Sequence, residues 1–221
     1  MKHKFTTIIL LSGLFFVNTL KINAQNTDFA WLKQINQSNA GFKPVSVFLS
    51  ETTKPMIIAV PLIVGGIGLL TDNNNLLYDA AYIIGASAVN YTITYSLKKV
   101  VNRSRPYESY PQDINNYQIL DDASMPSGHT SGAFATATAL SLKYPKWYII
   151  APSYLWAASV GYSRMHLGVH YPSDVLAGAV VGAGSAWLTW KANEWFHDKY
   201  EIRKFRILKK NGLSEVPAYW E

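Results

Sequence analysis

Five apolar segments between residues 55 and 190 limit the folds available to this chain more than any other feature. In order, they are Pro55 to Leu70, Leu76 to Leu97, His129 to Leu142, Trp147 to Tyr162 and Ser173 to Trp190. None of them sustains the alternation of apolar and polar residues that marks a half-buried strand. Short connections favour antiparallel neighbours. The sequence therefore predicts an all-α fold, a helical bundle of five core helices.

The bundle is expected to be embedded in a membrane. Only 15% of the residues are charged, whereas soluble domains usually have about a quarter. Small residues in the third and fifth segments suit close helix packing in lipid, and tryptophans gather at segment ends, as in an aromatic belt. Because several segments are near the lower length limit for crossing a bilayer, a tightly packed soluble bundle is the alternative.

Residues 1–24 have the pattern of a secretory signal, which would form an N-terminal signal helix. Lys2 and Lys4 precede an apolar run from Ile8 to Val17, and Ala24 offers a small residue at a cleavage position. An uncleaved signal anchor is the alternative. Either signal would send the rest of the chain out of the cytoplasm.

Three regions are expected after the signal. Residues 25–55 form an extracytoplasmic segment, in which apolar residues from Phe29 to Ile35 recur at helical spacing and Pro44 is read as a break. Residues 56–196 hold the helical bundle, and residues 197–221 form a basic tail.

Charge and cysteine content exclude several classes of function. The formal net charge is +6, and Lys2, Lys4 and Lys21 lie before the cleavage point, which leaves +3 for the mature chain. No stripe of basic residues alternates with stacking aromatics, so a nucleic-acid partner is not expected. The chain has no cysteine, which excludes disulfides, thiol catalysis and Cys-ligated zinc.

Three polar clusters meet at one end of an up-and-down bundle. The first runs from Lys98 to Pro106, the second from Pro126 to His129, and the third from Ser163 to Asp174. The loop after the second segment shares an end with the loop between the fourth and fifth segments. Basic residues in the loops of the other end follow the positive-inside rule, so we expect the clusters to face the outer side.

The residue types in these clusters suit a phosphoryl group. Lys98, Arg105 and Arg164 are three cations for the oxygens of one phosphate. Ser127 and Gly128 lie at a helix start, where a hydroxyl and backbone N–H groups bind anions. Fixed positive charges would also stabilise the charge that builds up during phosphoryl transfer.

The histidines of the clusters suit covalent catalysis. His170 and Asp174 are four residues apart, so the carboxylate can hold one ring nitrogen and leave the other free as a nucleophile. His129 lies where it could reach a leaving oxygen, and His166 is expected to be structural. Asp121, Asp122 and the histidines match no metal-ligand spacing, so no metal site is expected.

In order and spacing, the clusters resemble the signature of the type 2 phosphatidic acid phosphatase and vanadium haloperoxidase superfamily, over roughly residues 76–192. That signature is Lys, six residues, Arg-Pro; then Pro-Ser-Gly-His; then Ser-Arg, five residues, His, three residues, Asp. Every named position is present in this chain, from Lys98 to Asp174.

The resemblance implies a role for each matching residue and implies no cofactor. His170 would become phosphorylated, Asp174 would orient it, and His129 would act as general acid and then as general base. The phosphoryl oxygens would be bound by Lys98, Arg105, Ser127, Gly128 (through its N–H) and Arg164.

The segment layout resembles the membrane lipid phosphatases of the superfamily. The expected substrates are phosphate monoesters or pyrophosphates of lipids: undecaprenyl pyrophosphate, phosphatidylglycerophosphate, phosphatidic acid or a lipid A phosphate. The site would lie on the periplasmic side of a bacterial inner membrane. Mean hydropathy is only +0.02, so a soluble, nonspecific periplasmic acid phosphatase is the alternative, followed by a vanadate-dependent haloperoxidase. The 107–125 loop is read as a lid or a connector.

Overall fold

The computed structural model describes residues 27–38 and 40–210, with side chains up to residue 196, and within them it has helices and no strands. This confirms the all-α bundle. The signal predicted at residues 1–24 lies outside the described residues. Residues 27–37 are helical, and the elements that follow are η1 (Ala40–Phe42), α2 (Lys43–Glu51), α3 (Thr53–Leu70), α4 (Asn74–Val101), α5 (Pro106–Ser109), α6 (Gly128–Lys143), α7 (Trp147–His166) and α8 (Pro172–Lys210).

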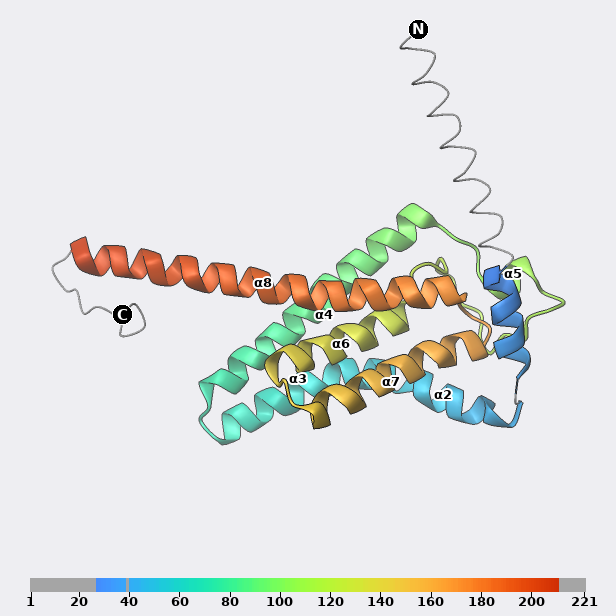
Figure 1. The fold of residues 1–221 in the computed structure, drawn as a ribbon, viewed down its shortest axis with the longest axis horizontal. Helices are drawn as coiled ribbons and strands as arrows, with labels where there is room; N and C mark the ends of the chain where they lie inside the picture. Colours follow the sequence, from blue (N-terminus) through green and yellow to red (C-terminus); the bar gives the residue numbers. More distant parts are fainter. Residues whose placement is uncertain (1–26, 39, 211–221) are drawn as a thin grey trace, which may run out of the picture.

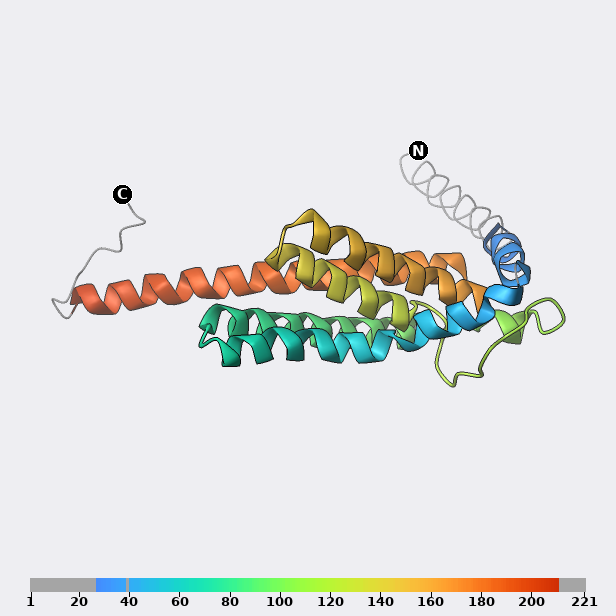
Figure 2. The same cartoon turned by 90° about the horizontal axis from the view of Figure 1, so that it is seen from below.

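Helix α6 is the centre of the bundle. It packs against α8, α7, α4 and α3, and the pair α3–α4 lies side by side along one flank (Figure 2). Helix α8 projects well beyond the other helices (Figure 1). Its helical backbone continues to Lys210, so the first part of the predicted basic tail extends the last core helix.

Small residues bring α6 and α8 into close contact. A Cβ atom added to Gly182 would lie 2.1 Å from the carbonyl oxygen of Ser131, and one added to Gly178 would lie 2.7 Å from that of Ser127. Only glycine permits this backbone approach. The same contact joins the starts of the two helices, where the Ser127 N–H donates to the Asp174 carbonyl oxygen at 3.0 Å. Two of the predicted clusters therefore meet through the backbone.

Helix ends place polar residues at the same end of the bundle. Helix α4 ends at Val101 and is capped by Asn102, which has a φ of 44° in the left-handed region, a conformation that asparagine tolerates better than most residues. Helix α6 begins after Ser127, whose side chain accepts a hydrogen bond from the Thr130 N–H. Because α4 stops there, Lys98 is in its last turn and Arg103 lies just beyond it.

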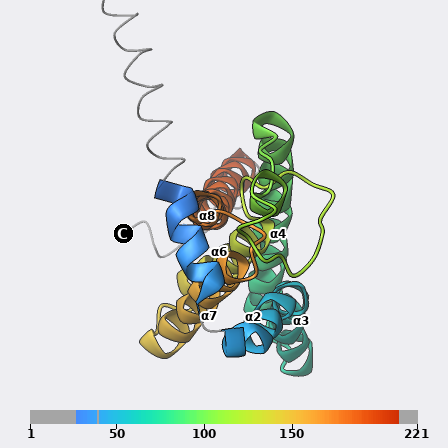
Figure 3. The same ribbon diagram turned by 90° about the vertical axis from the view of Figure 1, so that its right-hand side faces the viewer.

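The segment from residue 27 to Glu51 covers this end of the bundle. The expected helix is present over residues 27–37 and crosses the end of the bundle in Figure 3. Asn36 fixes it there, with its Nδ2 donating to the His166 carbonyl oxygen at 3.0 Å. The sequence does not predict helix α2, because Pro44 indicates a break. In the structure Pro44 lies in the first turn of that helix, where proline is well tolerated.

One stretch of the described residues, Ala40–Leu70, is long and apolar enough to cross a membrane. Its most apolar window has a mean hydropathy of 1.8 and is only 17% buried in the bundle. Large apolar side chains of α3 are exposed, namely Ile58, Leu62, Ile63, Ile67, Leu69 and Leu70.

Candidate active site

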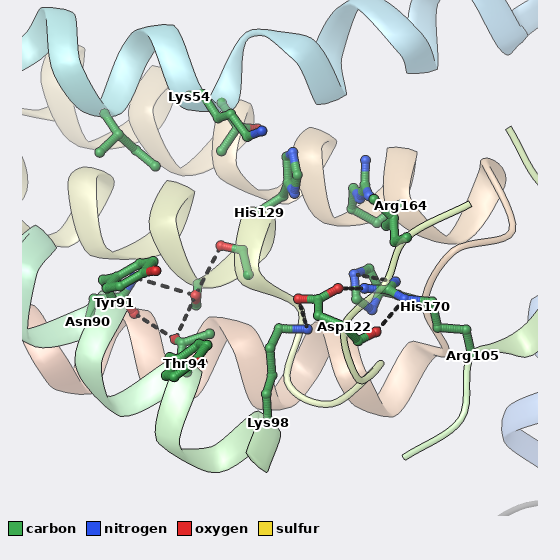
Figure 4. A pocket seen from close by; sticks show the side chains of 16 residues that line it. Lys54, Asn90, Tyr91, Thr94, Lys98, Arg105, Asp122, His129, Arg164 and His170 are labelled. Atoms are coloured by element: carbon green, nitrogen blue, oxygen red, sulfur yellow. Dashed lines mark hydrogen bonds and ion pairs between the residues drawn. The ribbon is translucent and has the colours of Figure 1, made fainter. Parts of the chain in front are cut away.

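The three predicted clusters line one cavity of about 520 Å³ at the end of the bundle (Figure 4). The predicted residues that line it are Lys98, Arg105, Gly128, His129, Arg164 and His170. The other two, Ser127 and Asp174, are completely buried behind its wall. The Ser127 Oγ accepts from the Thr130 hydroxyl at 2.9 Å, so its side chain is turned toward α6 rather than toward the cavity.

His170 is placed to act as a neutral base or nucleophile. It lies in the turn between α7 and α8, and 2% of its surface is exposed. Burial lowers its pKa to about 3, against the opposing effect of Asp174 and with added repulsion from Arg164 and Arg105. Its Nε2 lies 3.4 Å from Arg105 Nη1. A guanidinium can only donate, so Nε2 is the nitrogen that carries the lone pair.

The other ring nitrogen of His170 faces a carboxylate and a hydroxyl. His170 Nδ1 is 3.6 Å from Asp174 Oδ2 and 3.4 Å from Ser124 Oγ. The Ser124 hydroxyl also donates to Asp174 Oδ2 at 2.5 Å, and the Tyr171 N–H donates to the same oxygen at 2.9 Å. These hydrogen bonds hold the Asp174 carboxylate beside the His170 imidazole, and the Ser124 hydroxyl lies next to both groups.

Arg103 connects the site to the helix of residues 27–37. Its Nη1 donates to Asp174 Oδ1 at 2.7 Å, and its Nη2 donates to Asp28 Oδ2 at 2.8 Å. The guanidinium also lies 3.8 Å from the centre of the Tyr171 ring. Asp28 further accepts from the Ser173 N–H at 2.9 Å. The sequence offered no signal for this link, because Asp28 is 75 residues away from Arg103 and in another element.

Two of the cations share one carboxylate. Asp122 Oδ2 is 3.1 Å from Lys98 Nζ, and Asp122 Oδ1 accepts from Arg105 Nη2. Burial would raise the pKa of Asp122, but Lys98 and Arg105 together hold it below its usual value. Arg105 is fixed further by donating to the carbonyl oxygens of Asp122 at 2.9 Å and Val169 at 2.7 Å.

Arg164 differs from these cations because most of its donors are unused. Its side chain is completely buried, and Nη1 donates to Ser50 Oγ. Its Nε and Nη2 are buried without any hydrogen-bond partner. Unsatisfied buried donors are costly, so a ligand with acceptor oxygens would stabilise this arrangement.

His129 lies in the cavity between Lys54 and Arg164 (Figure 4). It is the second residue of α6, directly after Gly128. His166, by contrast, points away to the N-terminal segment, with Nδ1 2.8 Å from Ser46 Oγ and Nε2 2.9 Å from the Ser38 carbonyl oxygen. Among the described side chains, those of residues 27–38 and 40–196, no three His, Asp or Glu residues are grouped so as to hold a metal ion.

The sequence model of the PAP2 superfamily matches residues 79–198, which contain all three clusters. A lipid A 4'-phosphatase of Bacteroides thetaiotaomicron is 30% identical over 146 residues, which are 60% of this chain and 63% of that relative. The match thus spans slightly less than two thirds of that relative's length. An undecaprenyl-diphosphatase BcrC of Bacillus subtilis is 28% identical over 153 residues, 69% of this chain and 76% of the relative.

Two solved structures have the same arrangement of helices. One is a transmembrane PAP2 type phosphatidylglycerolphosphate phosphatase from Bacillus subtilis, with a TM-score of 0.64 and 21% identity, covering 78% of this chain and 87% of that one. The other is LpxE of Aquifex aeolicus, with a TM-score of 0.57 and 28% identity, covering 73% of this chain and 93% of that one.

Proposed function

The chain belongs to the PAP2 superfamily, and we propose that it is a metal-independent phosphatase of lipid-linked phosphate monoesters or pyrophosphates, acting through a phosphohistidine. The observation that carries the proposal is the buried Arg164, whose Nε and Nη2 have no partner and which lines the same cavity as His170. A neutral nucleophile and unsatisfied cationic donors in one cavity suit a phosphoryl group.

Phosphate binding would use cations that already line the cavity of the free protein. Phosphoryl oxygens would take the free N–H groups of Arg164 and compete with Asp122 for Lys98 and Arg105. The Asp122 side chain is 55% exposed, so it can turn out to solvent when an anion replaces it. The backbone N–H of Gly128 at the start of α6 adds a further donor.

Transfer would proceed in two balanced steps. His170 Nε2 attacks phosphorus, the N–P bond forms and the bond to the leaving oxygen breaks, with His129 giving that oxygen a proton. Asp174 and Ser124 stabilise the positive imidazole through Nδ1–H. His129 must therefore hold a proton as an imidazolium in the first step and be neutral in the second. Water then loses a proton to neutral His129 and attacks phosphorus, which breaks the N–P bond and frees inorganic phosphate and neutral His170.

Apolar surface beside the cavity supports a lipid substrate in a membrane. The part of the cavity wall that α3 and α4 form includes Ile57, Tyr91 and Tyr95. Tyr91 and Tyr95 are exposed, as are the apolar side chains of α3. Many exposed apolar side chains near a cavity suit contact with lipid. We therefore propose that the chain lies in the bacterial inner membrane, with the cavity on the periplasmic side, and favour this over a soluble acid phosphatase.

Phosphate release from detergent-purified protein in the presence of EDTA tests the proposal. The substrates are undecaprenyl pyrophosphate, phosphatidic acid, phosphatidylglycerophosphate, lipid A and p-nitrophenyl phosphate. We expect phosphate release from a lipid substrate, and we expect this release to disappear in His170→Ala. His166 is a buried histidine outside the cavity, so the folded fraction of His166→Asn should retain turnover. Turnover of the small ester alone, by protein that stays soluble without detergent, would instead identify the soluble enzyme.

A further inference from the structure

The cavity extends past His129 to two residues that the proposed chemistry does not use. Thr53 and Lys54, in the first turn of α3, both line it. Thr53 is 1% exposed, and its Oγ1 has no hydrogen-bond partner. Lys54 makes no salt bridge with the described part of the chain, and its charge acts on the His129 imidazole. Figure 4 shows Lys54 beside His129.

A buried hydroxyl without a partner would be stabilised by a ligand that offers it an acceptor oxygen. Leaving such a group unsatisfied costs about 1–3 kcal/mol, and most buried hydroxyls in folded proteins find a partner. Arg164 presents the same situation in the same cavity, with two free donors. His129 therefore lies among groups that favour an anion, namely the free donors of Thr53 and Arg164 and the Lys54 ammonium.

The charge balance of the cavity exceeds what one phosphate needs. Its lining has four cationic side chains (Lys54, Lys98, Arg105 and Arg164) and one carboxylate (Asp122), which leaves three positive charges. A phosphate monoester carries about −1.5 to −2 at neutral pH. A terminal diphosphate has one more ionised oxygen group and therefore carries about one more negative charge. The diphosphate matches the lining better.

We infer that Thr53 and Lys54 form a second subsite, which binds the inner phosphate of a lipid diphosphate while the outer phosphate lies against His170. The inference rests on the proposed function and narrows its substrate class. His170 Nε2 attacks the outer phosphorus, the bond from that phosphorus to the bridging oxygen breaks, and the lipid monophosphate leaves with its charge stabilised by Lys54. Both residues precede residue 79, where the superfamily match begins, so the subsite is built from this chain's own N-terminal part.

Matched isoprenoid substrates test this subsite. We would measure kcat/KM for farnesyl diphosphate and for farnesyl monophosphate with wild type, Lys54→Gln and Thr53→Val. We expect wild type to prefer the diphosphate. Each substitution should reduce that preference about tenfold, the effect of losing a hydrogen bond to a charged group. Thr53→Val should also leave the melting temperature unchanged or raise it, since it removes an unsatisfied hydroxyl.

Lys146→Gln is the matched control, because it removes the same charge from an exposed position at the start of α7, away from the cavity. Its preference for the diphosphate should equal that of wild type. Equal losses on both substrates in Lys54→Gln, or a wild type that prefers the monophosphate, would overturn the subsite without overturning the proposed phosphatase activity. Release of phosphate from none of these substrates would instead overturn the proposed function.

Discussion

Replacing Arg164 by methionine should make the free protein more stable and nearly inactive. The guanidinium is completely buried, with one hydrogen bond to Ser50 and two nitrogens without partners. Methionine fills a similar volume without polar atoms. Relief of the unsatisfied donors is worth about 1–3 kcal/mol, and the lost Ser50 hydrogen bond costs about 1 kcal/mol. The free energy of unfolding should therefore rise by up to about 2 kcal/mol.

The assay combines thermal unfolding with turnover. For a chain of this length, 1 kcal/mol corresponds to about 2–4 °C, so the melting temperature of Arg164→Met, followed by tryptophan fluorescence, should rise by up to about 8 °C. Turnover should fall by about 10²–10³, as for the loss of one donor to a transferring group. Inorganic phosphate should stabilise wild type but not the variant. A melting temperature that drops by several degrees would instead show that Arg164 is a structural residue.

Three further predictions concern charge and orientation. Because the pKa of His170 is lowered to about 3, its ¹⁵N chemical shifts should remain those of a neutral ring from pH 7 to 4.5. Because His170 takes up a proton more readily in the unfolded chain, the free energy of unfolding should fall progressively as the pH falls from about 6.5 toward 3. An imidazolium at pH 6 in the folded protein would contradict this prediction. Asp122→Asn should strengthen product inhibition by inorganic phosphate several-fold, because it frees Lys98 and Arg105; an unchanged inhibition constant would mean that Asp122 does not compete. The chain has no cysteine, so in intact cells a membrane-impermeant maleimide should label Asn116→Cys, near the cavity end, and not Lys146→Cys; the reverse pattern would place the site on the cytoplasmic side.

Long apolar segments made the core helices predictable. Such stretches favour helices regardless of detailed side-chain contacts, and α3, α4, α6, α7 and α8 lie where they were expected. Helix ends were harder, because α8 continues past Trp190 through a polar stretch that carries no apolar signal. Helix α2 could not be predicted from Pro44, because proline breaks a helix interior but is well tolerated in a first turn, where Pro44 lies.

The site residues also fall into some that the sequence could predict and some that it could not. His170 and Asp174 are four residues apart at a helix start, and short-range spacing of this kind can be read from sequence. Ser124 and Asp28 could not be found that way, because they reach Asp174 and Arg103 from a loop and from a helix far away in the chain. Arg103 appeared to be one more basic residue after an apolar segment, and only tertiary packing shows that it holds the Asp174 carboxylate.

Trapping the covalent intermediate tests whether His170 carries the phosphoryl group. The protein would be mixed with a ³²P-labelled lipid substrate, quenched within milliseconds in alkali and digested. We expect a labelled peptide that is stable in alkali and labile in acid, with the phosphate on His170, and no label in His170→Ala. Phosphate release at the wild-type rate with no labelled histidine, or label on another residue, would contradict this expectation.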